Sequence, residues 1–207
     1  MNNNDRITEI ALELQSITRN GLSYVKDKYD KERFEIISDL AAELLSISSG
    51  IEKTTLVQIF NDQKGYQTPK VETRGVVIEK DKILLVKENN KWALPGGWMD
   101  YNLTVSENTI KEVQEESGYS VEARDIIAVQ NRNHHNSPRT IFEVIKVFVK
   151  CRMIGGCFKE NMETSDAKFF SQDEISSLEL DVDKTTFEQL EMCFELCRNE
   201  NHKVVFD

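Results

Sequence analysis

The sequence has few of the residues that mark exported, fibrous or membrane-spanning proteins. It contains 4 cysteines, 3 prolines and 9 glycines, and only 8% of its residues are aromatic. No apolar run approaches the length that a transmembrane helix needs, and the N-terminus lacks a basic head followed by an apolar core. We therefore expect a cytoplasmic protein with no membrane partner.

The four cysteines do not follow a disulfide or metal-binding pattern. No C-x-x-C pair occurs, and no export signal is visible. Cys193 and Cys197 lie one helical turn apart and can in principle form one edge of a metal site. Because no histidine lies within one helical turn of them, packing within a helix is the better interpretation, and we expect reduced thiols.

Positive charge is also scarce: 26 Lys and Arg residues against 36 Asp and Glu residues give a formal net charge of -10. This charge repels a phosphate backbone, so long nucleic acid is not an expected partner. A small phosphorylated ligand that carries a divalent metal ion remains compatible. The 207 residues, 39% of them hydrophobic, suit a globular domain of ordinary size with a small accessory domain.

Apolar residues recur at three- and four-residue spacing between Asp5 and Ser49, which predicts two amphipathic helices. Asn20-Gly21 and the charged stretch from Lys26 to Arg33 predict a break between them. The helices carry no catalytic pattern, so we interpret them as a packing or dimerisation module. Residues 1–66 are assigned to a small all-helical N-terminal domain.

After Gln67-Thr68-Pro69 the hydrophobic period changes to that of β-strands. A tight turn at Lys80-Asp81 predicts a hairpin, and Gly118 predicts the end of a helix. Residues 67–207 are therefore assigned to a second domain, of α/β class with a mixed sheet. Its strands are expected at Val71–Glu79, Lys82–Lys87, Val121–Asn131, Ile141–Cys151 and Ala167–Phe170, and its helices at Val105–Ser117 and Lys184–Asn199.

The residues that can carry chemistry are concentrated between Gly96 and Tyr119. On a helix, Glu112 and Glu116 are one turn apart and Glu115 is three residues from Glu112, so their carboxylates can converge. Converging carboxylates repel one another unless a cation neutralises them, and Mg²⁺ prefers hard oxygen ligands. The alternative is a solvated acidic helix face in an acidic protein.

This segment resembles the Nudix box: Gly, five residues, Glu, seven residues, then Arg-Glu-aliphatic-x-Glu-Glu-x-Gly-aliphatic. The resemblance implies a Nudix α/β/α sandwich that cleaves the diphosphate bond of a nucleoside diphosphate linked to a small group. It further implies that Glu112, Glu115, Glu116 and the Gly97 carbonyl bind Mg²⁺ or Mn²⁺. Six of the nine specified positions match, namely Gly97, Glu112, Val113, Glu115, Glu116 and Gly118.

Three positions depart from the box. Leu103 stands where the first glutamate belongs, and Lys111 replaces the arginine that braces the glutamates, losing its planar fork. Tyr119 replaces an aliphatic residue, which changes packing only. The missing glutamate motivates a rival hypothesis, in which the protein is a non-catalytic sensor that binds a nucleotide.

The segment Gly-Gly-Trp-x-Asp, with Lys-Glu-Val-x-Glu-Glu-Ser-Gly-Tyr after it, is similar to the Nudix subgroup that includes CDP-choline pyrophosphatase. That subgroup has a helical N-terminal domain and forms dimers, so the resemblance implies a homodimer with CDP-choline as the leading substrate. An ADP-ribose or nucleotide-sugar pyrophosphatase is the nearest alternative. An RNA end-processing enzyme is a third, which the net charge disfavours.

The general base is not fixed by the box, and in Nudix enzymes it often comes from a later loop. Glu163 is the first candidate, with Glu160 on the same loop. His134 and His135 follow a predicted strand, and His134 is a candidate substrate contact. For either histidine, a polar loop side chain is the alternative interpretation.

Arg74, Trp98 and Tyr101 are the remaining candidate substrate contacts. Arg74 can donate to a diphosphate, or form an ordinary strand salt bridge. Trp98 and Tyr101 can stack on a base or face a quaternary ammonium, although Trp98 can equally belong to the core. Lys111 is interpreted as a brace or phosphate contact and not as a base, because an exposed lysine stays protonated; an ordinary surface lysine is the alternative.

Overall fold

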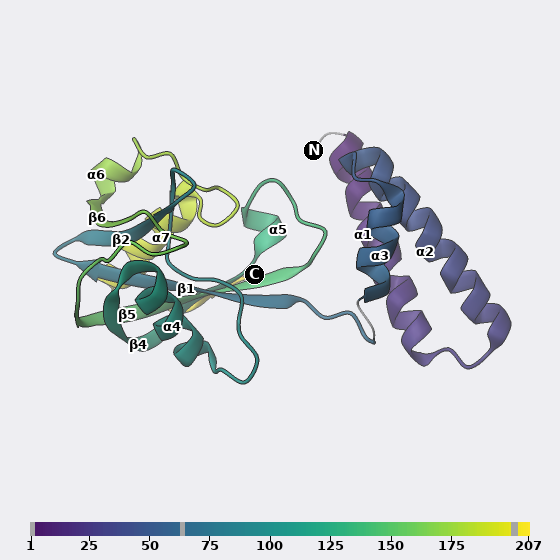
Figure 1. The fold of residues 1–207 in the computed structure, drawn as a ribbon, viewed down its shortest axis with the longest axis horizontal. Helices are drawn as coiled ribbons and strands as arrows, with labels where there is room; N and C mark the ends of the chain where they lie inside the picture. The colour runs from purple at the N-terminus through teal and green to yellow at the C-terminus, as the bar shows by residue number, and fades with distance from the viewer. Residues whose placement is uncertain (1–2, 63–64, 200–202) are drawn as a thin grey trace. The chain divides into compact units, whose positions relative to one another are not determined.

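The computed structural model describes residues 3–62, 65–199 and 203–207. The chain divides into two compact units, Met1–Thr68 and Pro69–Asp207, of which the first is helical and the second is an α/β domain (Figure 1). Within the described ranges, no helix is long and apolar enough to cross a membrane.

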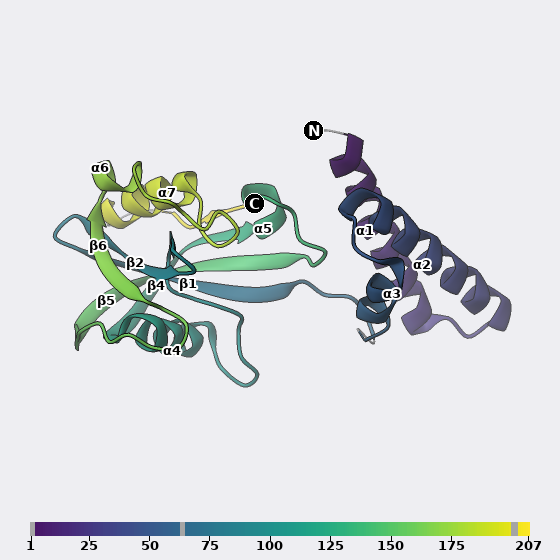
Figure 2. The ribbon, with the colours of Figure 1, turned by 45° about the horizontal axis from the view of Figure 1, so that its top comes forward.

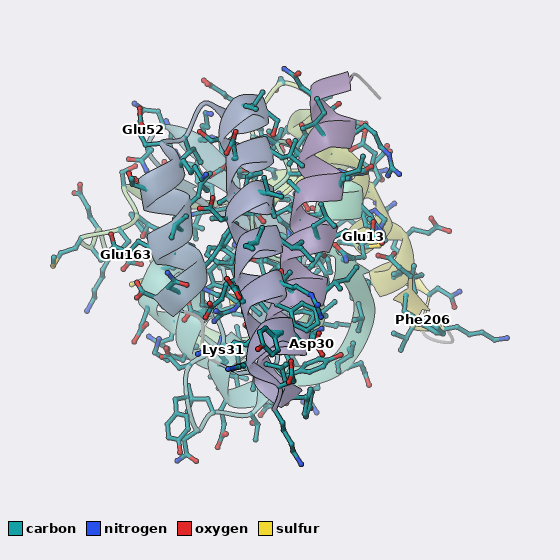
Figure 3. The ribbon with its side chains drawn as sticks, turned by 90° about the vertical axis from the view of Figure 1, so that its right-hand side faces the viewer. Glu13, Asp30, Lys31, Glu52, Glu163 and Phe206 are labelled. Carbon is teal, nitrogen blue, oxygen red and sulfur yellow. The ribbon has the colours of Figure 1, made fainter. Side chains whose placement is uncertain are left out.

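The first unit contains α1 (Asn3–Tyr24), α2 (Lys28–Ser49) and α3 (Lys53–Asp62). Helices α1 and α2 run antiparallel, with hydrogen bonds from Thr8 Oγ1 to Ser48 Oγ at 2.7 Å and from Ser38 Oγ to Gln15 Oε1 at 2.9 Å. Small buried residues of α2 let the two helices approach closely. Charged side chains lie on the outside of the module, among them Glu13, Asp30 and Lys31 (Figure 3).

The predicted break between the two helices lies at residues 25–27, but its predicted beginning at Asn20-Gly21 is wrong, because α1 continues through it to Tyr24. A Cβ added at Gly21 would lie 2.5 Å from Cζ of Phe34 on α2, so this glycine serves close helix packing and not a turn. Helix α3 was not predicted. Its Lys53 pairs with carboxylates of α2, and its Leu56 and Phe60 are buried.

The α/β domain contains one mixed sheet with the order β3-β2-β1-β5-β4-β7, in which β6 also pairs with β2. Strands β1 and β5 are parallel, as are β4 and β7, and the other neighbours are antiparallel. The strands are β1 (Lys70–Glu79), β2 (Lys82–Glu88), β3 (Lys91–Ala93), β4 (Tyr119–Asn131), β5 (Val144–Gly156), β6 (Asp166–Ser171) and β7 (Val205–Phe206).

Helices cover both faces of this sheet. Figure 2 shows α4 (Val105–Ser117) on one side of the strands and α6 (Gln172–Ile175) with α7 (Phe187–Arg198) on the other. The short α5 (Arg132–His135) follows β4. Two apolar clusters fill the space between the sheet and the helices. One includes Leu190 and Phe194 of α7, and the other includes Val113 of α4. The predicted α/β/α sandwich with a mixed sheet is confirmed.

Several predicted boundaries need small corrections. The β1–β2 hairpin has the predicted turn, and α4 matches its prediction at both ends. The last helix begins at Phe187 and not at Lys184, because Thr186 caps it. Strand β5 begins at Val144, three residues later than predicted. All four cysteines have free thiols, as expected.

Candidate active site

Helix α4 is fixed at both ends by its own sequence. Thr104 and Glu107 form a capping box, in which each side chain accepts the backbone N–H of the other residue. Gly118 ends the helix with φ of 72° and donates its N–H to Gln114 O. The last two turns, which carry three glutamates, therefore have a defined position and direction.

Glu116 is the most buried of these glutamates, with 7% of its surface exposed. Its Oε2 accepts the Gly96 N–H at 2.8 Å. Burial raises the pKa of Glu116 to about 7, because the Gly96 amide and Arg74 compensate only part of the lost hydration. Glu112 lies against Gly97, where an added Cβ would be 2.7 Å from Glu112 Oε2. The missing side chain at Gly97 thus makes room for Glu112.

The turn between β3 and α4 lies directly against β1. Gly96 has φ of 145°, and a Cβ there would lie 2.0 Å from Thr73 O. The Pro95 and Gly97 carbonyls accept the N–H groups of Gly75 and Thr73 at 2.8 and 2.9 Å. The Gly97 carbonyl, predicted to bind metal, therefore already accepts one hydrogen bond and has one lone pair free.

Lys111 lies among three carboxylates. Its Nζ is 2.9 Å from Glu115 Oε2, 3.1 Å from Glu112 Oε1 and 3.1 Å from Asp100 Oδ2. The hydrogen bonds to Glu115 and Glu112 raise the pKa of Lys111, so its side chain is an ammonium at neutral pH. The structure thus places a cation between two glutamates of the box.

A cavity of about 510 Å³ opens beside α4 and β1. Among the described residues that line it, seven are carboxylates and three are cationic. It brings together the predicted residues Gly97, Glu112, Glu116, Arg74, Trp98 and Glu163. The charged lining residues that the sequence analysis missed are Glu72, Glu88, Asp100, Arg132, Asp183 and Lys184.

Glu72, Arg74 and Lys146 form a buried charge cluster on the neighbouring strands β1 and β5. Glu72 lies 3.2 Å from Arg74 Nη2 and 3.3 Å from Lys146 Nζ. Burial alone would raise the pKa of Glu72, but the two cations outweigh it and hold that pKa below its usual value. Burial lowers the pKa of Lys146 to about 8. A lysine inside the apolar β5 sequence was the signal that could have revealed this cluster.

The Arg74 guanidinium makes its hydrogen bonds inside the protein. Nη1 donates to Gly96 O at 2.7 Å and to Leu94 O at 3.2 Å, while Nη2 donates to Glu72. These bonds fix the turn whose Gly96 amide holds Glu116. Together with the bond from Nε to Glu72 Oε1 at 3.4 Å, they engage four of the five guanidinium N–H groups, so a direct bond from Arg74 to a phosphate would have to use the second N–H of Nη2 or replace one of them.

Glu163 reaches the cavity on a loop that is tied to the end of α4. Asn161 Nδ2 donates to the backbone carbonyls of Glu115 and Glu116 at 3.0 and 3.3 Å, and Thr164 Oγ1 donates to Glu116 O at 2.5 Å. Asn161 Oδ1 accepts the N–H groups of Glu163 and Thr164, both at 2.9 Å. The loop and the glutamate helix are therefore positioned together.

Four predicted site residues lie outside the cavity lining: Tyr101, His134, Lys111 and Glu115. Tyr101 is 99% exposed, and His134 is exposed on α5. Trp98 does line the cavity and is 52% exposed.

The aromatic face of Trp98 already has a cationic neighbour. Lys70 Nζ lies 5.5 Å from the centre of the Trp98 ring and 4.1 Å from that of Phe142. Such distances are those of cation–π contacts, so the protein's own ammonium already interacts with this ring.

The ligand atoms available in the cavity are carboxylate oxygens, which divalent cations such as Mg²⁺ prefer. Glu112 and Glu116 line one cavity, and the raised pKa of Glu116 reflects a buried carboxylate with incomplete charge compensation. In the part of the chain that the structure describes, no three His, Cys, Asp or Glu side chains come close enough to hold a metal ion alone. Mg²⁺ suits this arrangement, since it commonly takes one or two carboxylates and completes its shell with water and substrate phosphates.

Two family models and a curated protein match this chain. The NUDIX domain model matches residues 69–191, and a model described as the UDP-X-like, N-terminal oligomerisation domain of Nudix proteins matches residues 5–60. The curated protein "Putative ADP-ribose pyrophosphatase YjhB" of Bacillus subtilis (strain 168) is 35% identical over 201 residues, which are 96% of each chain.

Two solved structures are also similar. A UDP-X diphosphatase superposes over 99% of both chains with a TM-score of 0.64 and 27% identity. An ADP-ribose pyrophosphatase from Streptococcus suis 89-1591 is 43% identical, with a TM-score of 0.62, and covers 68% of this chain and 100% of its own. With a family model that spans more than half of its residues and a relative matched along nearly its whole length, this chain belongs to the Nudix hydrolase family.

Proposed function

We propose that the protein hydrolyses the diphosphate linkage of a nucleoside diphosphate derivative and that Mg²⁺ or Mn²⁺ is required. The charge of the cavity carries this proposal: seven carboxylates and three cationic side chains surround it. A diphosphate would be repelled by this lining unless divalent cations neutralised it. Glu112 and Glu116 line the same cavity, so both carboxylates are available to such a cation.

Glu112, Glu115, Glu116 and the Gly97 carbonyl are the proposed metal ligands. A divalent ion bound there would polarise the diphosphate and lower the pKa of a bound water. The residues of the chain hold these ligands in place: the Gly96 amide holds Glu116, and the Lys111 ammonium holds Glu112 and Glu115. Arg74 supports the same site through its hydrogen bond to the Gly96 carbonyl.

Glu163 is the proposed general base. Glu163, Glu160 and His134 are all exposed, but only Glu163 lines the cavity. A carboxylate at the mouth of the cavity can accept the proton of an attacking water without a large change in its own environment. Hydrogen bonds from Asn161 and Thr164 to α4 hold its loop beside the helix that carries the proposed metal ligands.

ADP-ribose is the proposed first substrate. The Streptococcus suis structure with 43% identity is named as an ADP-ribose pyrophosphatase. CDP-choline, favoured by the Gly-Gly-Trp-x-Asp segment, is the second candidate. At Trp98 a choline ammonium would meet the Lys70 ammonium and be repelled, whereas a neutral base would stack there without this cost.

A homodimer formed through the helical module is part of the proposal. The matching N-terminal model describes an oligomerisation domain. Helix α2 also exposes an apolar stripe: Tyr29, Ile36, Leu40 and Ile47 fall on one side of the helix and are 58%, 54%, 52% and 70% exposed. An unpartnered apolar stripe of this kind is typical of a protein interface.

The test of the substrate is a phosphate-release assay on the purified full chain with a coupled phosphatase. ADP-ribose, CDP-choline, nucleotide sugars, dinucleoside polyphosphates and nucleoside triphosphates are compared with Mg²⁺ or Mn²⁺ present. We expect ADP-ribose to give the highest kcat/KM and EDTA to abolish turnover. Nucleotide binding without turnover of any substrate would favour the sensor hypothesis instead.

The test of the general base compares two glutamates of one loop. Glu163→Gln is expected to lower kcat about 10²- to 10⁴-fold, because the water loses its proton acceptor. Glu160→Gln, outside the lining, is the matched control and should keep wild-type kcat. Equal activity of the two variants would remove Glu163 from the proposed mechanism.

A further inference from the structure

The segment that precedes α4 is anchored to the helix through the side chain of Asn108. Asn108 is fully buried, and its Nδ2 donates to Thr73 Oγ1 at 2.9 Å. Its Oδ1 accepts the Asp100 N–H at 2.9 Å. Asn102, with φ of 67°, reverses the chain between Asp100 and the helix. Asp100 is thereby anchored through its backbone beside the second turn of α4.

This anchoring places the Asp100 carboxylate next to Lys111. The ammonium of Lys111 has three N–H donors, and the three nearest carboxylates are those of Asp100, Glu112 and Glu115. Each therefore occupies one direction around the same nitrogen. Position 103, where the Nudix box has a glutamate, is a leucine and provides no carboxylate.

We infer that Asp100 supplies the carboxylate that is absent at position 103, as a positioning residue that acts through Lys111. Asp100 holds the Lys111 ammonium, and Lys111 in turn directs Glu112 and Glu115. The inference rests on the proposed function, in which these two glutamates bind metal. It also explains how a box that lacks its first glutamate can keep an ordered set of carboxylates.

The exposure of both side chains indicates that the Asp100–Lys111 ion pair contributes little to stability and acts mainly by ordering the site. The Asp100 side chain is 56% exposed and that of Lys111 is 35% exposed. Ion pairs at such exposure contribute little to the free energy of folding, because water and salt screen them. Removing the Asp100 charge should therefore disturb metal binding while leaving the melting temperature nearly unchanged.

The experiment measures Mn²⁺ binding to the full chain by electron paramagnetic resonance of the free ion, in about 0.5 M KCl to screen distant charges. Asp100→Asn is expected to raise the Mn²⁺ Kd about 10-fold, the usual effect of losing a residue that orients metal ligands. Asp125→Asn, an exposed carboxylate on β4, is the matched control and should bind like wild type. Melting temperatures of both variants report whether the fold is intact.

Two further variants test whether Asp100 acts through Lys111 and whether it replaces the glutamate that the box has at position 103. In a Lys111→Met background, Asp100→Asn should cause no additional loss of Mn²⁺ affinity; a full further loss would overturn the role through Lys111. Leu103→Glu should restore Mn²⁺ binding to Asp100→Asn, and a failure to restore it would overturn the replacement of the box glutamate.

Mn²⁺ binding also separates this inference from the proposed function. If wild type does not bind Mn²⁺, the proposed metal site itself is wrong. If wild type binds Mn²⁺ and Asp100→Asn binds equally well, the inference about Asp100 fails while the proposed function stands.

Discussion

Three buried charges beside the cavity show how single residues support the site. Lys146 is fully buried, and its ammonium donates to Asn136 Oδ1 at 2.9 Å and to Lys184 O at 2.7 Å besides pairing with Glu72. Its third partner, Glu72, also binds Arg74. Because every donor has an acceptor, the charge is tolerated in the interior despite its desolvation.

The buried position of Lys146 predicts a pH dependence of stability. Its folded-state pKa is about 8 and its ordinary value is 10.5, so the unfolded chain binds more protons between those values. The contribution of Lys146 to the free energy of unfolding should therefore rise with pH between these two values, by at most about 1.4 kcal/mol per pH unit.

Urea unfolding of wild type and Lys146→Met between pH 7 and 10 measures this effect. The wild-type value minus the variant value cancels the titration of other groups, and we expect this difference to increase above pH 8. A difference that stays constant or decreases would show that the pKa of Lys146 is not lowered in the folded protein.

Gly96 predicts a second effect at a single residue. In Gly96→Ala the new Cβ would meet the backbone oxygen of Thr73 at 2.0 Å, at a φ of 145° that L-residues rarely adopt. We expect the free energy of unfolding to fall by about 3 kcal/mol or more. Gly155→Ala, where nothing lies within 4 Å of the added Cβ, is the control and should change stability little. Comparable melting temperatures for the two variants would contradict the prediction.

At the scale of elements, the sequence predicted best where the signals were local. The end of helix α4 was predicted because Gly118 supplies the cap within the helix's own sequence, and the predicted start at Val105 agrees with the Thr104 cap of the structure. The break at Asn20-Gly21 was predicted wrongly because the reason for that glycine is Phe34 on another helix. Strand β3 and the two-residue β7 form only through pairing with β2 and β4, so local patterns did not reveal them.

The candidate site follows the same rule. The glutamates of α4 were predicted from their spacing within one helix. Glu72, Lys146 and Arg132 come from separate strands or from a strand end, and only the parallel pairing of β1 with β5 sets Glu72 opposite Lys146. Asp100 was not predicted because its contact with Lys111 depends on a chain reversal before α4.

The loop that carries Glu163 predicts an effect at this scale. Thr164→Val removes the hydroxyl that binds the Glu116 carbonyl and keeps the side-chain shape, so Glu163 should lose its fixed position. We expect kcat to fall about 10- to 100-fold with little change in KM. Thr164→Ser keeps the hydroxyl and should retain most activity.

A double variant tests whether Thr164 acts through Glu163. Adding Thr164→Val to Glu163→Gln should lower kcat no further if the threonine only positions the base. An additive loss would mean that Thr164 affects the metal ligands through Glu116 and not the base.

At the scale of the whole molecule, net charge and assembly act against each other. Each chain has a formal charge of -10, so two chains repel at long range. Association must then come from short-range apolar contact, which the exposed stripe of α2 can supply. Because the α/β domain has its own core, loss of the dimer should leave its fold intact.

The stripe predicts a specific disruption of the dimer. Ile36→Glu combined with Leu40→Glu adds two charges to its centre, and each would lose hydration in a dimer interface. Light scattering coupled to size-exclusion chromatography should give twice 23.9 kDa for wild type and 23.9 kDa for the variant. Ile154→Glu, at a 55% exposed position of β5, is the control and should remain dimeric. If the double variant stays dimeric, the interface lies elsewhere, and if wild type is monomeric, the dimer is removed from the proposal. Because the proposed metal ligands and the base come from one chain, the monomeric variant should also keep wild-type turnover per protomer; a loss of turnover would mean that the partner chain contributes to the site.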